Sequence, residues 1–444
     1  MRKTARIALA FKFVAVAALV YAAFNYKRMF ETVHEAQLPP PKILNRAEEF
    51  RSFSPGQVNH TTPGTCTPRK KFVFIKTHKT GSCTTINIFQ RYAIYNRLRV
   101  LMPVGQGPLS WPFPPREQDY VHQPDEQYDA QMHHFVYNKP WLLSKFPPDT
   151  PYISIIRQPY SHLKSEFNYF RFPHLLDIHS ENPLKTFLTN PWMYRNKSEI
   201  FFPHVNVSWD GTRNPLTFDL GWPAEKADNE EDARSYINQI ETEFTLVMIL
   251  EHLAESLVLL RRLLCWNIKD VVLYARKENE RAYSFKKYVA TPEEMQNHRR
   301  WAAVDYMLYD TFNKSLWRKI HSQGPDFYSE VEYFKRICGV ISDYCNKTME
   351  ESKRMDRAKK NLTEVKMVVK ASQWSPEFEV DRTYCSYITS VKVYAMDVRM
   401  RGRPYTKDEM SRKMMDQNAN IPLMRRGLPS FFTRYEARLA GIDV

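Results

Sequence analysis

The sequence predicts an α/β fold with a central parallel β-sheet flanked by helices. Short runs made almost entirely of apolar residues recur along the chain, which is typical of parallel strands buried on both faces. A segment with the helical spacing of apolar residues follows each run and indicates strand–helix units. The 444 residues are 43% hydrophobic, which is enough for a sizeable core and excludes a mainly disordered chain.

The individual elements are expected in the following order. Strand–helix pairs are predicted at 71–75 with 82–96, at 152–156 with a helix beginning at Pro159, and at 244–250 with 253–265. The strand segments are rich in β-branched and aromatic residues. Proline suits the first position of a helix, where no backbone N–H is needed. Residues 271–274 are a candidate fourth strand, and the proline-rich segment 103–125 is interpreted as a loop.

The predicted domain organisation begins with a membrane anchor. Residues 7–24 form an apolar run, close to the roughly 20 residues that a membrane span needs. We predict a transmembrane signal anchor there, with a cleaved signal peptide as the alternative. The full division is a cytoplasmic tail at 1–6, the anchor at 7–24, a proline-rich stem at 25–68, the main α/β domain at 69–348 and a charged C-terminal extension at 349–444.

Sequons and cysteines favour an oxidising lumen for the chain after the anchor. Six N-x-[ST] sequons follow it, at Asn59, Asn196, Asn206, Asn313, Asn346 and Asn361. Six cysteines fit such a compartment. Cys338 and Cys345 are close enough in sequence to be a candidate pair, although the connectivity is not readable. No His/Cys cluster has zinc-ligand spacing, so we expect no structural metal.

The net charge points to an anionic partner. A formal charge of +15 favours a nucleic acid, a lipid surface, or a phosphorylated or sulfated small molecule. A secretory anchor argues against nucleic acid. The basic C-terminal stretch around Arg399, Arg401 and Arg403 is interpreted as a solvated surface, with acidic lipids or sulfated glycans as the alternative partners.

The loop after the first strand has the features of an anion site. It reads Lys76-Thr77-His78-Lys79-Thr80-Gly81-Ser82-Cys83-Thr84-Thr85 and joins a strand to a helix. Backbone N–H groups at a helix N-terminus bind phosphate-like anions, and a glycine permits close approach. It is not a Walker A loop, in which Lys follows the last glycine, because Lys79 precedes Gly81. An ordinary strand-to-helix turn is the alternative interpretation.

A second set of polar residues follows the second strand. Arg157 lies at its carboxyl end, and Ser165 comes eight residues later in the next helix. Ligands of parallel α/β sheets bind beyond the carboxyl ends of the strands, and an arginine there can hold a phosphate in bidentate fashion. The alternative is a surface arginine and a solvent-facing serine.

These motifs resemble the galactose-3-O-sulfotransferase family, which includes galactosylceramide sulfotransferase. The resemblance covers about residues 70 to 320, in the stretches FIKTHKTGSCTTINI, MHHFVYN, LEHLAESLVLLRRLLCWNIKDVVLYARKEN and VDYMLYDTFNKSLW. KTHKTGSCT resembles a 5′-phosphosulfate-binding loop, and R-x7-S resembles a 3′-phosphate site. Cys83 stands where many relatives have serine. The resemblance implies a P-loop-like sulfotransferase fold.

The resemblance also implies an activity: a single-pass type II Golgi enzyme that transfers a sulfuryl group from 3′-phosphoadenosine 5′-phosphosulfate (PAPS). The acceptor would be the 3-hydroxyl of galactose on a glycolipid or glycoprotein glycan, with no metal required. Lys79 would stabilise charge on the 5′-phosphate, and Arg157 and Ser165 would bind the 3′-phosphate. The phosphosulfate would be held by Lys79, Thr80, Gly81, Ser82, Cys83 and Thr84.

The acceptor hydroxyl needs a general base, for which His134 is the candidate. The segment MHHFVYN lies between the two cofactor motifs, where related carbohydrate sulfotransferases place a basic histidine. His133 is the second candidate, and His78 is expected to shape the loop.

Two other functions remain open at this point. One is a carbohydrate sulfotransferase that uses a different acceptor hydroxyl or a uronic-acid-containing chain. The other is a catalytically silent lumenal glycan-binding protein, which the presence of Lys79, Arg157 and Ser165 disfavours. The sequence does not distinguish a lipid-linked from a protein-linked acceptor, and it leaves the oligomeric state undetermined.

Overall fold

The computed structural model describes residues 66–104, 108–113, 115–202, 206–274, 283–358, 366–389 and 407. The predicted tail, the predicted anchor at 7–24 and nearly all of the stem lie outside the described residues, as do the sequons at Asn59 and Asn361. The described residues all belong to one compact unit that begins at Thr65. Among the helices of this part of the chain, none is both long and apolar enough to cross a membrane.

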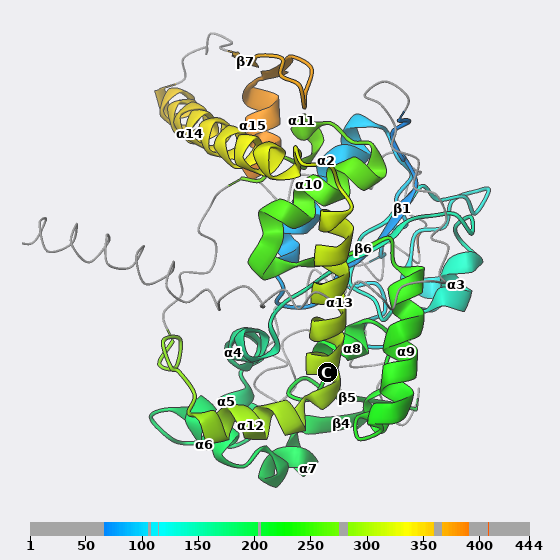
Figure 1. Cartoon of the computed structure of the whole chain (residues 1–444), viewed down its shortest axis with the longest axis vertical. Helices are drawn as coiled ribbons and strands as arrows, with labels where there is room; N and C mark the ends of the chain where they lie inside the picture. The colour runs from blue at the N-terminus through cyan, green and yellow to red at the C-terminus, as the bar shows by residue number, and fades with distance from the viewer. Residues whose placement is uncertain are drawn as a thin grey trace, which may run out of the picture. The chain divides into compact units, whose positions relative to one another are not determined.

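A four-stranded parallel sheet forms the centre of the fold (Figure 1). Its spatial order is β2 (Ala130–Gln131), β1 (Phe72–Ile75), β3 (Tyr152–Ile156) and β6 (Leu246–Ile249). Val73 pairs with Tyr152, and Ile153 pairs with Leu246, in parallel register. Every residue of these strands is buried, which explains why their segments are almost uniformly apolar. The parallel sheet expected from the sequence is therefore confirmed.

The prediction of a strand at 271–274 is wrong. Val271 ends the short helix α11 (Ile268–Val271), and the fourth strand of the sheet is β2. Strand β2 has only two residues, too few for a recognisable apolar run. Val271 and Val272 are buried in the core without pairing in the sheet. Burial without sheet pairing thus produced the same pattern as a strand.

Helices flank the sheet, as expected. The helix after β1 is α2 (Ser82–Tyr95), the one after β3 is α4 (Pro159–Tyr169), and the one after β6 is α10 (Leu253–Leu264). Two further helices, α9 (Glu230–Glu243) and α13 (Ala303–His321), pack against each other, and α13 also packs on β6 (Figure 1).

Smaller elements form a second, aromatic core beside the sheet. Phe167, Phe187, Trp209 and Trp301 are among its fully buried members. The elements around it and the sheet are α3 (Lys139–Leu143), α5 (Phe172–Leu175), α6 (Pro183–Thr189), α7 (Arg195–Ser198), α8 (Pro215–Asp219), α12 (Pro292–Trp301) and the antiparallel pair β4 (Glu199–Phe202) and β5 (Val207–Asp210). Buried Trp301 is therefore part of this core.

The C-terminal part contains a long helix and a small hairpin. Helix α14 (Phe327–Ala358) continues through residue 348, where the sequence suggested a boundary. It is followed by β7 (Met367–Val369), β8 (Phe378–Val380) and α15 (Arg382–Thr389), and the two strands pair antiparallel.

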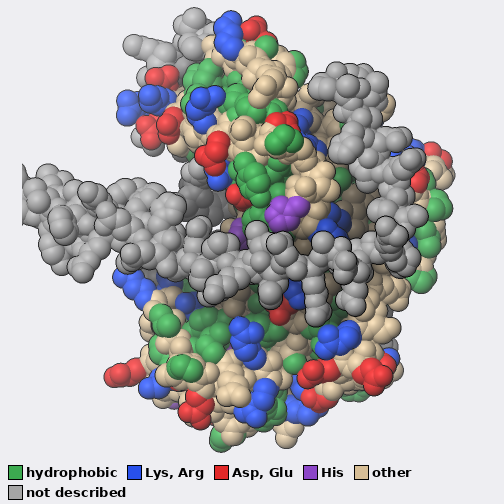
Figure 2. All heavy atoms as spheres, in the orientation of Figure 1, with side chains coloured by type: hydrophobic (Ala, Val, Ile, Leu, Met, Phe, Trp, Pro, Cys, Tyr) green, Lys and Arg blue, Asp and Glu red, His purple; other side chains and the backbone are tan. Residues whose placement is uncertain are grey.

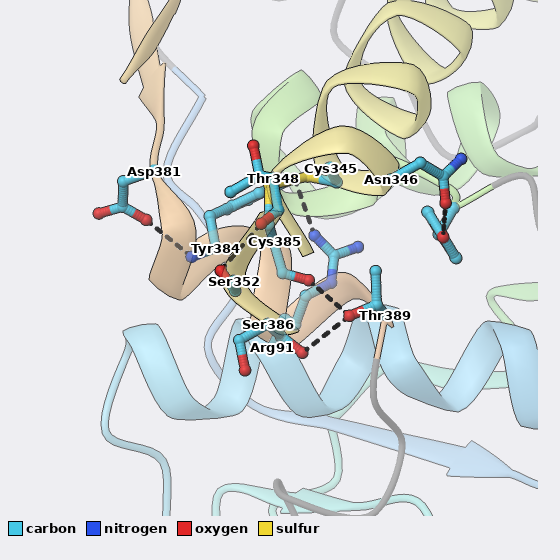
Figure 3. The surroundings of a disulfide bond; sticks show 11 residues. Arg91, Cys345, Asn346, Thr348, Ser352, Asp381, Tyr384, Cys385, Ser386 and Thr389 are labelled. Atoms are coloured by element: carbon cyan, nitrogen blue, oxygen red, sulfur yellow. Dashed lines mark hydrogen bonds between the residues drawn. A yellow bond between two sulfur atoms is a disulfide. The ribbon is translucent and has the colours of Figure 1, made fainter. Parts of the chain in front are cut away.

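Two disulfides connect distant segments, and the proposed pairing of Cys338 with Cys345 is wrong. Cys66 bonds Cys265, and Cys345 of α14 bonds Cys385 of α15 (Figure 3). Cys338 is a buried free thiol. Cys338 and Cys345 lie on one helix, about 10 Å apart along its axis, and a disulfide requires Cα atoms within about 7 Å. Because a helix holds residues seven positions apart too far from each other, Cys338 and Cys345 cannot form a disulfide.

Two arginines of α10 are paired with a single carboxylate. Arg261 and Arg262 both form ion pairs with Glu330 of α14, at 2.5 and 2.7 Å. The Glu330 side chain is completely buried. Burying a carboxylate requires a cation beside it, so this pair of arginines connects α10 to α14.

Candidate active site

The loop between β1 and α2 exposes an uncapped helix N-terminus. Lys79 and Gly81 have left-handed backbone conformations, with φ of 49° and 72°. A Cβ atom on Gly81 would lie 2.7 Å from Leu250 Cδ1 and would also strain the left-handed backbone, so glycine is favoured here. No side chain caps α2, and its first turn contains no acidic residue. This helix end has the donor groups and the polarity for an anion.

The hydroxyl groups of the loop stabilise its own conformation. Thr80 Oγ1 lies 2.8 Å from Thr77 Oγ1, and the Ser82 hydroxyl donates to the Thr77 carbonyl at 2.6 Å. The Thr77 hydroxyl in turn donates to the Ile155 carbonyl of β3. Thr77, Thr80 and Ser82 are all buried. These bonds fix the loop against the sheet, while Cys83 is exposed and Thr84 is half-buried on the first turn of α2.

A lysine and a histidine form the centre of the site. Lys76 Nζ lies 2.5 Å from His134 Nε2, and His134 Nδ1 lies 2.6 Å from the Lys76 carbonyl oxygen. Since a carbonyl only accepts, Nδ1 carries the hydrogen and Nε2 accepts from the ammonium group. Burial lowers the pKa of Lys76. Burial, and then the charges of His78 and Lys76, hold the pKa of His134 well below its usual value. His134 is therefore a neutral imidazole whose Nε2 is an acceptor.

His78 is held next to this pair by a buried carboxylate. The His78 and His134 rings stack with centroids 3.8 Å apart. Asp219, at the end of α8, accepts from the His78 backbone N–H at 2.7 Å and faces His78 Nδ1 at 3.0 Å. Trp111 Nε1 donates to the other Asp219 oxygen at 2.6 Å. Asp219 thus orients the imidazole that supports His134.

Lys79 and Arg157 meet at the carboxyl ends of β1 and β3. Arg157 Nη1 donates to the Lys79 carbonyl at 3.3 Å, and burial lowers the pKa of Arg157. Lys79 Nζ lies 4.0 Å above the ring of Tyr169, on α4. Ser165 lies on the same helix and is half-buried. The structure therefore brings the predicted Arg157 to the predicted loop.

The two neighbouring histidines have different environments. His134 contacts the loop, whereas His133 Nε2 lies 3.2 Å from Met102 Sδ. A further histidine that the sequence did not single out, His162, has Nε2 2.8 Å from the His78 carbonyl. Burial lowers the pKa of His162 to about 3, so its ring is neutral and donates to that carbonyl. Of the two neighbouring histidines, His134 therefore faces the loop and His133 does not.

Three site residues, Lys76, Trp111 and Asp219, were missed by sequence reasoning. Lys76 was inside the loop but was not assigned a role. Trp111 and Asp219 follow no motif, and Asp219 is 141 residues from His78. The one signal available for Lys76 was a lysine placed directly after a fully apolar strand.

Within the described ranges, one group of three side chains has the spacing of metal ligands: Glu117, His122 and Glu126. Lys145 Nζ lies 3.3 Å from Glu117 and 3.6 Å from Glu126, so an ammonium group already balances these carboxylates. We assign no metal to it.

The fold and the loop define an α/β protein with an uncapped helix N-terminus at the carboxyl edge of its sheet, next to a neutral imidazole. Comparison with known proteins is more specific. The model of the galactose-3-O-sulfotransferase family matches residues 2–354. The chain belongs to the galactose-3-O-sulfotransferase family. No solved structure matches it.

Three relatives illustrate the similarity. Galactose-3-O-sulfotransferase 2 of pig (Sus scrofa) is 34% identical over 58% of this chain and 64% of its own length. Galactose-3-O-sulfotransferase 3 of Bos taurus is 35% identical over 58% of this chain and 60% of its own. Galactosylceramide sulfotransferase of Mus musculus is 30% identical over 68% of each chain. The chain thus matches less than two thirds of the length of the pig and bovine relatives.

Proposed function

We propose that this protein transfers a sulfuryl group from PAPS to the 3-hydroxyl of a galactose on a glycolipid or glycoprotein glycan. The proposal rests chiefly on the Lys76–His134 pair beside the uncapped end of α2. Lys76 is buried and, among the described residues, has no carboxylate within ion-pair distance. Burial lowers the pKa of Lys76 and so disfavours its charged form, and an anionic ligand at the loop would stabilise that charge.

The residues present fit such a donor. Lys79 and the N–H groups at the start of α2 would hold the 5′-phosphosulfate. Arg157, next to the Lys79 carbonyl, and Ser165 on α4 would hold the 3′-phosphate. When bound, PAPS supplies the sulfuryl group and an anionic leaving group.

The base in this proposal is Nε2 of His134. That atom accepts from the Lys76 ammonium group, which occupies its lone pair. An anion at the loop competes for the ammonium, because a charge-assisted bond to an anion is stronger than one to a neutral nitrogen. Lys76 would then turn from His134 to the anion, and Nε2 would be free to take the proton of the galactose hydroxyl.

His78 and Asp219 act on the position of His134. The stacked His78 ring fixes the plane of the base, and Asp219 holds His78 through its backbone N–H and its ring Nδ1. Pre-organisation of this kind lets a base act without rearrangement at the moment of reaction. Asp219 is thus a positioning residue.

We further propose that the enzyme is a type II Golgi membrane protein with a lumenal catalytic domain. The predicted anchor at residues 7–24 supports this location, as do the sequons after it. The two disulfides support an oxidising compartment.

The test is sulfate transfer from radiolabelled PAPS by the full-length protein, with galactosylceramide, lactosyl glycans and glycosaminoglycans as acceptors. Label on the 3-position of galactose, lost in Lys79→Ala and in His134→Ala, would support the proposal. Loss in Lys79→Ala but not in His134→Ala would move the base to His78 or His133. Label confined to glycosaminoglycans would overturn the galactose assignment and favour another sulfotransferase.

A further inference from the structure

A second concave site lies between α14 and the turn that joins β7 to β8. It has a volume of about 700 Å³, is open to solvent, and is lined by Tyr328, Ser329, Glu332, Tyr333, Arg336 and Trp374. The first five lie within two and a half turns of α14, and Trp374 comes from the hairpin. None of them belongs to the loop site described above. In Figure 1, α14 and β7 lie close together at the end of the molecule that also contains α15.

Aromatic rings form the inner wall of this pocket. The rings of Tyr333 and Trp374 are 5.1 Å apart at an interplanar angle of 43°. Tyr333 is almost fully buried, whereas Tyr328, five residues earlier, is 52% exposed. An exposed aromatic side chain beside a packed aromatic pair offers flat apolar faces to an occupant.

Polar side chains also line the pocket. Ser329, Glu332 and Arg336 are exposed there, and the Arg336 guanidinium lies 5.5 Å above the Tyr333 ring. The Tyr333 hydroxyl and Trp374 Nε1 are buried, so they do not face an occupant. The exposed polar groups favour an occupant with hydroxyls over a purely apolar one.

The charged side chains of Glu332 and Arg336 limit the chemical classes of ligand that the pocket can bind. Glu332 bonds Lys335 at 3.0 Å and is exposed at the rim. A carboxylate in the wall disfavours phosphate or sulfate, and the Arg336 and Glu332 side chains disfavour a lipid chain. A neutral ring with C–H faces for stacking and hydroxyls for hydrogen bonds satisfies both the aromatic and the polar groups.

We propose that this pocket binds a hexopyranose of the acceptor glycan, separate from the galactose that receives the sulfuryl group. The identity of this occupant rests on the proposed function, whereas the presence of the pocket is observed independently of that function. A second contact with the glycan would raise the affinity for large, multiply branched acceptors through effective concentration, without altering the chemical step.

The test compares Tyr328→Ala and Arg336→Ala with the matched control Arg354→Ala, an exposed arginine further along α14. The full-length protein is titrated, without donor, with a glycoprotein bearing galactose-terminated N-glycans and with the same protein after deglycosylation. Sulfation of methyl β-galactoside is measured in parallel. Both pocket variants should bind the glycoprotein about tenfold more weakly, while the control binds like wild type. All three should turn over methyl β-galactoside at the wild-type rate.

Three results would overturn the pocket assignment. They are unchanged glycoprotein binding by both pocket variants, equal binding of the deglycosylated protein, and loss of methyl β-galactoside turnover in the pocket variants. Glycan binding that depends on Tyr328 and Arg336, in a wild-type protein that sulfates nothing, would instead overturn the proposed function and leave the pocket standing.

Discussion

At the scale of single residues, the Lys76–His134 pair determines what the site can do. The two side chains come from segments 58 positions apart, and each is held by a backbone contact or by burial. A lysine that binds an imidazole in one state and an anion in another couples ligand binding to the availability of a base.

The first prediction replaces Lys76 by methionine, which keeps the length of the side chain and removes its charge. We expect transfer to fall by at least about 100-fold, the size of effect seen when one charge-stabilising group is lost. The positive charge of Lys76 contributes to the low pKa of His134. The acidic limb of the kcat profile should therefore move to higher pH, because a base with a higher pKa is protonated earlier.

The matched control is Lys70→Met, an exposed lysine just before β1, which should retain wild-type rates. The pH–rate profiles of the three proteins provide the measurement. Wild-type transfer with an unmoved acidic limb in Lys76→Met would remove Lys76 from the mechanism.

The second prediction concerns His298, which is buried in α12 away from the loop. Burial, and then the charge of Arg299, lowers its pKa to about 3, against about 6.5 in an unfolded chain. Between these pH values the unfolded state binds one more proton than the folded state. The neutral His298 imidazole therefore costs no stability above pH 6.5, and the unfolding free energy decreases as the pH falls below that value. At pH 5 the loss is about 2 kcal/mol.

When the pH is lowered from 7 to 5, the unfolding free energy of His298→Asn should therefore fall by about 2 kcal/mol less than that of wild type. Denaturant titrations at both values measure this difference. The variant must be compared with wild type because Asp305 also titrates in this range. Burial raises the pKa of Asp305 to about 7, so this group stabilises the fold as the pH falls, equally in both proteins. The exposed His179→Asn should behave like wild type; equal slopes for all three proteins would contradict the prediction.

At the scale of elements, the turn between β1 and α2 creates the anion site. Its shape depends on the left-handed Gly81, whose missing side chain leaves room for Leu250. The same elements show what patterns can predict. Strands β1, β3 and β6 and their helices were predicted because burial on both faces leaves a continuous apolar run. Strand β2 was not, because two residues make no pattern.

The third prediction is that Gly81→Ala weakens binding of the donor. Alanine in this left-handed conformation costs roughly 1 kcal/mol, and its Cβ would press on Leu250. The loop would move, and affinity for adenosine 3′,5′-bisphosphate should fall about tenfold or more in calorimetry. Gly339→Ala, on the exposed side of α14 with open space around it, should leave the affinity unchanged.

A second substitution separates the two causes. Leu250→Ala in the Gly81→Ala background relieves the contact but not the backbone strain, so it should restore the affinity only in part. Complete restoration would mean that the conformation of Gly81 is unimportant and that steric contact alone disturbs the loop.

At the scale of the whole described unit, distant contacts hold the C-terminal segment to the sheet domain. The disulfide between Cys345 and Cys385 joins α14 to α15, and Arg91 of α2 donates to the Tyr384 hydroxyl at 2.9 Å (Figure 3). Surface charge shows no comparable organisation. On the part of the face coloured in Figure 2, Lys and Arg side chains are interspersed with Asp and Glu, so the net charge of +15 does not concentrate there in a single basic patch.

The fourth prediction tests this connection with the double variant Cys345→Ser/Cys385→Ser. The disulfide closes a loop of 40 residues, and loss of such a constraint costs about 4 kcal/mol by the loop-entropy relation. The melting temperature of the full-length protein should fall accordingly. Cys338→Ala, which removes a buried thiol outside any disulfide, should cost less; equal melting temperatures for the double variant and wild type would contradict the pairing.

The sequence by itself determined the parallel α/β class, three strand–helix units, the turn between β1 and α2, and the resemblance to the family. These features are encoded by neighbouring residues, through periodicity, burial and turn geometry. The tertiary structure decided the rest. It paired Cys345 with Cys385, placed Glu330 between Arg261 and Arg262, and brought Asp219 to His78 across 141 residues. Such contacts depend on how elements pack in space, and no local pattern specifies which distant residue will supply the partner.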